Sequence, residues 1–378
     1  MDRDRASVRG PAVRRVTVIG TGLIGTSIAL ALRARDVDVA LSDPDADSLR
    51  LACDLGAGRP LPEEGEGRPA DVAVVAAPPA AIPGVLRRAQ DRGLAHVYTD
   101  AASVKASVLA EAERLGCDTA TFVPGHPMAG REKHGPGAAR ADLFLGRSWA
   151  LCPTGKADTE TVAAVAELAR MCGATPRVVD AAAHDRAVAL ISHAPHVAAS
   201  AVAARLVDGD DTALALAGQG VRDVTRVAAG DPAMWMEILT HNAAPVAEVL
   251  AAISDDLAAT ARALGSLDRG GIAALASAPV RDLLVRGRNG QGRLPGKHGV
   301  VRRPDYTVVP VVIPDEPGAL GRLFASAADA GVNIEDVRIE HTPGLPLGIA
   351  QLSVLPSAVE TLSEALAGQG WSVHHPEG

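Results

Sequence analysis

The first half of the chain alternates short apolar runs rich in β-branched residues with stretches of helical pattern. Strands that alternate with helices build a mostly parallel sheet with helices on both faces. We therefore predict a doubly wound α/β domain over residues 14–180. The predicted strands are Val16–Ile19, Val37–Leu41, Val72–Ala76, Val97–Thr99, Phe122–Val123, Trp149–Leu151 and Val178–Val179.

Strand signals are absent between residues 181 and 285, where the chain has the pattern of long helices. Polar, glycine or proline breaks divide these helices near residues 208–211, 230–232 and 265–271. The pattern predicts an all-helical second domain. Residues 286–304 are rich in glycine and basic side chains and show neither the helical nor the strand period of apolar residues. Such a composition is typical of a flexible linker.

The last part of the chain, residues 305–378, returns to short elements of both kinds. The order strand, helix, strand, strand, helix, strand is that of the ferredoxin-like βαββαβ split arrangement. We predict these elements at residues 306–313, 318–330, 334–340, 349–355, 358–366 and 371–373.

Length and composition fit a soluble protein of several domains. A chain of 378 residues is too long for one compact domain, and 47% hydrophobic with 22% charged residues is ordinary for globular proteins. No uninterrupted apolar run reaches the roughly 20 residues of a membrane span, and the N-terminus lacks the apolar stretch of a secretory signal. We expect a cytoplasmic protein with no membrane partner.

Charge and cysteine content exclude other classes. A net charge of −8 argues against nucleic-acid binding, which needs basic side chains to neutralise phosphates. Cys53, Cys117, Cys152 and Cys172 form neither CxxC pairs nor a dense framework. We expect reduced thiols, no disulfide and no bound metal.

A glycine-rich turn follows the first predicted strand and opens a helix. In the sequence GTGLIG, Gly20 permits the tight turn, Gly22 lets the backbone approach a pyrophosphate, and Gly25 allows close packing of helix on strand. The N–H groups at the helix start, at Leu23 and Ile24, would face the phosphates. The strand, turn and helix together predict a dinucleotide site.

Cofactor choice depends on a carboxylate at the end of the second strand. Asp43 lies a little over twenty residues beyond Gly20, where it can bind the ribose hydroxyls and repel a 2′-phosphate. This favours NAD over NADP. Asp45 and Asp47 are close by, but we place both at the start of the following helix.

Candidate catalytic side chains follow the later strands. His126 lies in the loop sequence GHPMAG near the carboxyl edge of the sheet, where a histidine can be a base or a structural hydrogen-bonding group. The sequence DAASVK sets the Ser103 hydroxyl at the same edge, and SHAPH places His193 and His196 on one helical face.

The motifs GTGLIG, DAASVK, GHPMAGRE, His184–Asp185, SHAPH and RDVTRVAAGDPAMW, in this order and spacing, resemble the prephenate/arogenate dehydrogenase family of tyrosine biosynthesis. The resemblance covers about residues 14–285, and the C-terminal part looks like the ACT domain that some members append. It implies an NAD-binding Rossmann domain, a helical dimerisation and substrate domain, a homodimer, and an active site between the two domains.

The resemblance also implies a reaction. Hydride leaves C4 of prephenate for NAD, the ring carboxylate departs as carbon dioxide, and the product aromatises to 4-hydroxyphenylpyruvate. His126 would accept the proton of the C4 hydroxyl, and Ser103 would orient that hydroxyl. The residues expected to bind or surround the substrate are His196, His193, Arg226, Trp235 and Glu132, with Arg226 holding a carboxylate and Glu132 at the site entrance.

Several of these residues have plainer interpretations. His193 could fill a helix interface, Trp235 could be core, and His184–Asp185 is interpreted as structural. Gln219 and Arg131 depart from the small residues usual in the family, which leaves side-chain specificity open. The sequence does not separate prephenate from arogenate.

The C-terminal sequence IPDEPGAL, followed by GVNI, resembles the ACT pattern. A helix N-terminus there suits the carboxylate of an amino acid, so we expect an aromatic amino-acid effector near Asp315, Gly318 and Asn333. The alternative is a module that serves only dimer contacts.

Two rival functions remain. A β-hydroxy-acid dehydrogenase of related architecture would carry a helix lysine in the second domain, and no lysine lies between Lys156 and Lys297. A non-catalytic NAD or amino-acid sensor would not need Ser103, His126, His196 and Arg226.

Overall fold

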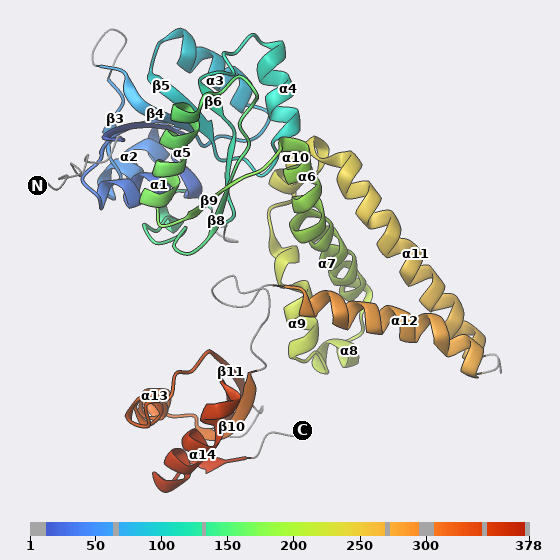
Figure 1. The fold of residues 1–378 in the computed structure, drawn as a ribbon. Helices are drawn as coiled ribbons and strands as arrows, with labels where there is room; N and C mark the ends of the chain where they lie inside the picture. The colour runs from blue at the N-terminus through green and yellow to red at the C-terminus, as the bar shows by residue number, and fades with distance from the viewer. Residues whose placement is uncertain are drawn as a thin grey trace, which may run out of the picture. The chain divides into compact units, whose positions relative to one another are not determined.

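The computed structural model describes residues 13–62, 68–130, 134–268, 273–294, 306–341 and 346–374. The chain divides into two compact units, residues 1–266 and residues 267–378 (Figure 1). The first contains a large sheet, a small sheet and a set of helices, and the second contains a long helix and a small α/β fold.

A six-stranded parallel sheet forms the centre of the first unit, with the order β3-β2-β1-β4-β5-β6. The predicted parallel sheet is therefore confirmed, and only β3 was not predicted. β3 has only two residues, one of them proline, and so short a strand gives no periodic signal in the sequence. The strands are β1 (Arg15–Ile19), β2 (Asp38–Ser42), β3 (Arg59–Pro60), β4 (Ala70–Val75), β5 (Ala95–Asp100) and β6 (Phe122–Val123).

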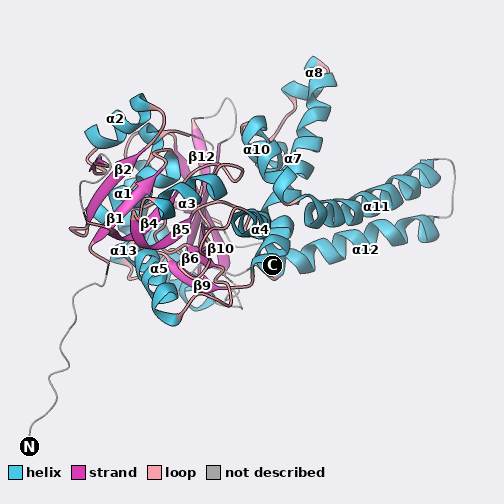
Figure 2. Cartoon of the chain, turned by 90° about the horizontal axis from the view of Figure 1, so that it is seen from above, coloured by secondary structure: helices cyan, strands magenta, loops and turns pink. Residues whose placement is uncertain are grey.

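Helices cover both faces of this sheet, and its magenta strands lie among cyan helices in Figure 2. Along β4, Val72 and Val74 pack with α1 (Leu23–Arg33) and α5 (Thr159–Met171). The intervening Ala73 packs with α3 (Ile82–Asp91) and α4 (Ala106–Arg114). Successive side chains point to opposite faces, so a fully apolar strand is what a doubly covered sheet requires. The remaining helix, α2 (Ala46–Asp54), follows β2.

A separate three-stranded sheet, order β7-β8-β9, stands beside the large one. It consists of β7 (Gly125–Pro127), β8 (Ser148–Leu151) and β9 (Thr175–Val178), with β7 antiparallel and β9 parallel to β8. The prediction that the strands near residues 150 and 178 continue the large sheet was wrong. The strand near residue 178 pairs with the one near residue 150, which in turn pairs with β7. β7 has only three residues around His126 and is too short and too polar to be predicted.

The helical part follows as α6 (Ala181–Val188), a π turn (Ala189–His193), α7 (Ala194–Arg205), α8 (Asp211–Ala215), α9 (Gln219–Thr225), α10 (Pro232–His241) and α11 (Ala243–Asp268). The predicted breaks near residues 210 and 231 are confirmed. Asp210 and Asp231 cap the helices that follow them, and Pro232 takes the first helical position.

The helical stretch Ala181–Asp208 is long enough, and apolar enough on average, to cross a membrane. About a third of its most apolar part is buried inside the protein. The prediction that no segment reaches this length was made from uninterrupted apolar runs, which charged residues break here. His184 and Asp185 in this stretch are buried and hydrogen-bonded to other parts of the first unit. These hydrogen bonds hold the start of the stretch against the rest of the first unit.

The second unit starts at residue 267, in the last turn of α11, and its first complete helix is α12 (Ala273–Gly292). Residues 286–292, predicted as the start of a linker, are helical, which corrects that boundary. The ion pair of Arg286 with Asp282, at 2.7 Å and spaced i,i+4, supports the last turns despite their glycines. Residues 295–304 of the predicted linker lie outside the described residues.

The rest of this unit is β10 (Thr307–Pro314), α13 (Ala319–Asp329), β11 (Asp336–His341), β12 (Leu347–Val354), α14 (Val359–Gly368) and β13 (Ser372–Val373). The four strands form an antiparallel sheet in the order β11-β12-β10-β13. Alternate residues of β10 and β12 pack against both helices to form one core.

Candidate active site

The glycine-rich turn after β1 has the geometry that its residues predict. Gly20 has φ +104°, and a Cβ there would lie 2.2 Å from the Ala76 carbonyl oxygen. A Cβ on Gly25 would lie 1.9 Å from the Gly20 oxygen, whereas one on Gly22 would meet nothing within 4 Å. The turn is therefore closely packed at Gly20 and Gly25 and open at Gly22, the position a pyrophosphate would approach.

Helix α1 begins at Leu23, so the first-turn N–H groups of Leu23 and Ile24 have no intrahelical partner. Donors in this position suit an anion.

Asp43 lies at the end of β2 and is hydrogen-bonded to the glycine-rich turn. Its Oδ2 accepts from the Thr21 backbone N–H at 2.6 Å and from the Thr21 hydroxyl at 2.9 Å. Its Oδ1 accepts from the Asp45 N–H at 2.8 Å. Since a carboxylate has about four acceptor positions, Asp43 orders the turn and keeps capacity for a ribose hydroxyl. Asp45 caps α2, and Asp47 lies in its first turn, as predicted.

His126 lies at the centre of β7, opposite Ala150 of β8. Its Nδ1 is 2.9 Å from Nε2 of His184. Burial, the neighbouring His184, and the positive charge of Lys105 hold the pKa of His126 well below its usual value. The lowered pKa favours the neutral imidazole, which is the form that can accept a proton.

A buried ion pair lies beneath the backbone of His126. The side chains of Lys105 and Asp100 are fully buried and form an ion pair. The Lys105 ammonium also donates to the Gly125 carbonyl at 2.6 Å, and the Gly125 N–H donates to Asp100 at 3.0 Å. A Cβ on Gly125 would lie 2.8 Å from the Asp100 carbonyl oxygen. This network fixes the residue directly before His126.

His184 and Asp185, interpreted as structural from the sequence, reach both predicted catalytic segments. His184 contacts His126, and the Asp185 carboxylate accepts the backbone N–H groups of Lys105 and Ala106, each at 2.8 Å. Those residues follow Ser103, which is half-buried in the turn between β5 and α4. Among the described residues, the Ser103 hydroxyl has no hydrogen-bond partner.

A second group of rings lies on the helices. His196 stacks on Trp235 with ring centroids 3.6 Å apart, and His193 approaches the same ring edge-on at 6.1 Å. A Cβ on Gly230 would lie 2.5 Å from Trp235 Nε1, so this stack requires glycine there. His193 is buried, and its Nδ1 lies 3.0 Å from the Asn242 amide nitrogen. Burial lowers the pKa of His193 to about 4.

Two predicted substrate residues remain, Arg226 and Glu132. Arg226 opens the 3₁₀ turn Arg226–Ala229, which packs against α7, and its side chain is exposed. Glu132, expected at the site entrance, and Arg131 lie outside the described residues. Asn242 was not predicted, although its position between α10 and α11 makes it a helix-boundary residue.

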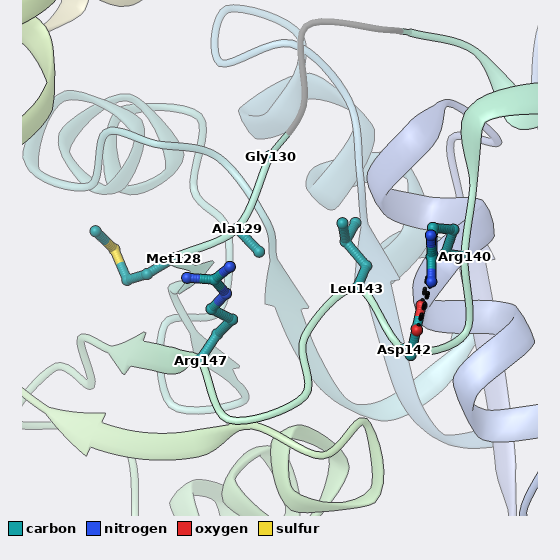
Figure 3. Close-up of a pocket in the computed structure, with 7 residues that line it drawn as sticks. All are labelled: Met128, Ala129, Gly130, Arg140, Asp142, Leu143 and Arg147. Carbon is teal, nitrogen blue, oxygen red and sulfur yellow. Dashed lines mark hydrogen bonds and ion pairs between the residues drawn. The ribbon is translucent and has the colours of Figure 1, made fainter. Parts of the chain in front are cut away.

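A cavity of about 410 Å³ adjoins the end of β7 (Figure 3). The Met128 N–H bonds to the Ser148 carbonyl at 2.9 Å, and the Arg140 N–H donates to the Ser27 hydroxyl of α1 at 3.0 Å. None of the predicted catalytic side chains lines this cavity. Its lining residues are Met128, Ala129, Gly130, Arg140, Asp142, Leu143 and Arg147.

Comparison with known proteins agrees with this arrangement. Residues 28–178 match the family model described as prephenate dehydrogenase, nucleotide-binding domain, and residues 180–275 match prephenate dehydrogenase, dimerization domain. The Streptomyces niveus protein named "Probable prephenate dehydrogenase NovF" is 41% identical over 95% of this chain and 99% of its own. Cyclohexadienyl dehydrogenase of Zymomonas mobilis is 31% identical over 68% of this chain and 90% of its own.

A solved structure extends the likeness to the fold. Prephenate dehydrogenase from A. aeolicus, in complex with hydroxyphenyl propionate and NAD+, superposes with a TM-score of 0.65 at 24% identity. The match covers 75% of this chain and 99% of that one. The chain belongs to the prephenate dehydrogenase family.

Proposed function

We propose that this protein is an NAD-dependent prephenate dehydrogenase that converts prephenate to 4-hydroxyphenylpyruvate by oxidative decarboxylation. The observation that carries the proposal is a partly buried His126, held 2.9 Å from His184 Nε2, in the same α/β domain as the glycine-rich turn. Sequence identity of 41% across nearly the whole length of the Streptomyces niveus relative supports the same reaction.

The residues of the turn fit NAD. Gly22 leaves open space for a pyrophosphate, and the half-buried Asp43 carboxylate favours ribose hydroxyls over a 2′-phosphate. When bound, NAD supplies the hydride acceptor. His126 accepts the proton of the C4 hydroxyl, which raises electron density at the carbon that loses hydride. Loss of the ring carboxylate completes aromatisation.

Other side chains orient the substrate. The Ser103 hydroxyl directs the C4 hydroxyl to His126, and the stacked His196 and Trp235 rings form a wall of the pocket, with His193 behind them. Arg226 holds a carboxylate of the substrate. Glu132 is proposed to lie at the entrance of the active site.

Arogenate is the second candidate substrate, since it shares the reacting ring and differs only in the side chain. The test is NADH formation by purified protein with each substrate, combined with NAD or NADP. Turnover of prephenate with NAD supports the proposal. Turnover of arogenate but not prephenate would make arogenate the substrate. Turnover of neither substrate, with NAD binding intact, would favour a non-catalytic sensor.

We also propose a cytoplasmic homodimer built through the helical domain, residues 181–285. Residues 180–275 match a dimerization domain, and these helices expose large apolar side chains, including Leu190, Ile191, Val202, Val207, Leu216, Met236 and Leu257. Apolar side chains exposed in such numbers are typical of an interface. Sedimentation analysis of the purified chain tests the assembly.

The C-terminal sheet and its two helices are proposed to be a ferredoxin-like ACT module, residues 305–378, that binds an aromatic amino acid. A cavity of about 150 Å³ lies at the end of β10 and the start of α13, lined in part by Asp315 and Gly318. Gly318 caps α13 with φ +85°. Asn333 does not line this cavity, and its amide donates to Glu335 at 2.6 Å. Tyrosine and phenylalanine are the effectors to test.

A further inference from the structure

An unbroken chain of hydrogen bonds runs from a carboxylate to the catalytic histidine. Asp185 Oδ1 is 2.8 Å from His184 Nδ1, and His184 Nε2 is 2.9 Å from His126 Nδ1. His184 and Asp185 are each 3% exposed, so water does not compete for these bonds. His184 and Asp185 lie on α6 and His126 lies on β7, so 58 residues of sequence separate the two histidines.

With Asp185 ionised and both imidazoles neutral, the donors and acceptors of the three groups determine which nitrogen carries each proton. An ionised carboxylate only accepts, so the proton between Asp185 and His184 belongs to His184 Nδ1. A neutral His184 then has a bare Nε2, which also only accepts. The proton between the two imidazoles therefore belongs to His126 Nδ1, and His126 Nε2 is left with a lone pair.

We propose that His184, held by Asp185, is a positioning residue that keeps His126 in the Nδ1–H tautomer, so that Nε2 is the proton acceptor. This inference rests on the proposed function, which assigns His126 as the base. The other neutral tautomer would carry its proton on Nε2 and could not accept one there. The hydroxyl proton moves to His126 Nε2, and the resulting imidazolium keeps its Nδ1–H bond to His184.

Asp185 is itself held from a second direction. Its two oxygens accept the N–H groups of Lys105 and Ala106, at the start of α4. The positive end of that helix favours a carboxylate. Its own backbone carbonyl accepts from the Asn242 amide at 2.8 Å. The carboxylate that orients His184 is thus fixed to the segment that presents Ser103.

The test compares three variants of the full-length protein. His184→Leu removes the acceptor that holds the His126 Nδ1 proton. His184→Gln places an amide oxygen, which is an acceptor, on a side chain of similar reach. Asp180→Ala removes the cap of α6, whose carboxylate accepts the Ala183 N–H at 2.9 Å, without touching the chain of hydrogen bonds.

With prephenate and NAD, we expect kcat of His184→Leu to fall by on the order of 100-fold while KM changes little, because general-base catalysis contributes about that much. His184→Gln should recover part of the loss, and Asp180→Ala should keep the wild-type kcat. Equal activity of the His184→Leu and wild-type proteins would overturn the proposal. So would a loss that appears equally in the glutamine variant and the capping control.

A spectroscopic measurement separates this inference from the proposed function. ¹⁵N NMR of protein labelled at its histidine nitrogens, with His126 assigned by its absence in His126→Asn, reports which ring nitrogen carries the proton. We expect protonated Nδ1 and bare Nε2 in the wild type, and a shift toward the other tautomer in His184→Leu. If the wild-type protein turns over neither substrate, the proposed function fails, whereas a wild-type His126 protonated on Nε2 overturns the inference itself.

Discussion

Replacing Lys105 by methionine should be strongly destabilising, because it leaves a carboxylate buried without its counter-ion. Both Lys105 and Asp100 have fully buried side chains, and the ammonium also donates to the Gly125 carbonyl. Removing one partner of such a pair costs about 3–5 kcal/mol, the uncompensated charge being the main part. Methionine fills most of the volume of the lysine stem, so the cavity contribution should be small.

That loss is large against the total stability of about 5–15 kcal/mol that is typical of folded proteins. Urea unfolding of the two proteins measures it directly. Arg50→Met is the matched control, because Arg50 pairs with Asp47 at 2.8 Å on the surface, with side chains 70% and 79% exposed. Exposed pairs contribute about 0–1 kcal/mol, so this variant should be close to wild type.

A double variant identifies the cause. In Lys105→Met with Asp100→Asn, no net charge is buried, and the amide oxygen can still accept the Gly125 N–H. The double variant should therefore be more stable than Lys105→Met alone. A loss below about 1 kcal/mol for Lys105→Met, or a double variant that is no better than the single one, would refute the reasoning.

Three further predictions concern the cofactor turn, acid stability and regulation. Gly22→Ala should keep the wild-type melting temperature and lose NAD affinity in calorimetry, whereas Gly25→Ala should lower the melting temperature, since its Cβ would overlap a backbone oxygen. Stable folding with normal NAD affinity in both variants would contradict this. The folded-state pKa of His193, lowered to about 4 from 6.5, means that the unfolded chain binds more protons between these values, so stability should fall as pH drops from about 6.5 to about 4. Chemical unfolding across this range should show a slope that is smaller in His193→Asn; equal slopes would assign the acid sensitivity to other groups. Asp315→Ala should weaken any effect of tyrosine or phenylalanine on turnover and leave turnover without effector unchanged, and an undiminished response would remove Asp315 from the effector site.

Local pattern was sufficient for the large sheet and the dinucleotide turn. Buried parallel strands are continuous apolar runs, and Gly20, Gly22 and Gly25 follow one of them at a fixed spacing. The aspartates that begin helices, such as Asp210 and Asp231, also act through neighbouring residues. Such features are encoded within a few positions of the chain and can therefore be predicted.

The hydrogen bonds that hold His126 and its neighbours in place could not be predicted in this way. Lys105, Asp185 and Asn242 act through hydrogen bonds to residues far away in the sequence, and no local period records which residues the fold brings together. One signal was available for His184 and Asp185. Two adjacent polar residues near the start of a largely apolar helix are more costly to bury than to expose, so burial there requires partners. The C-terminal end of α12 was not predicted to be helical because glycine, which is frequent there, has a low helix propensity.

The most direct test of the central claim is turnover by His126→Asn beside the wild type, with prephenate and NAD. The account predicts robust NADH formation by the wild type, a fall in kcat of at least about 100-fold in the variant, and an unchanged Kd for NAD. A variant that retains wild-type kcat would contradict the assignment of His126 as the base that accepts the substrate proton.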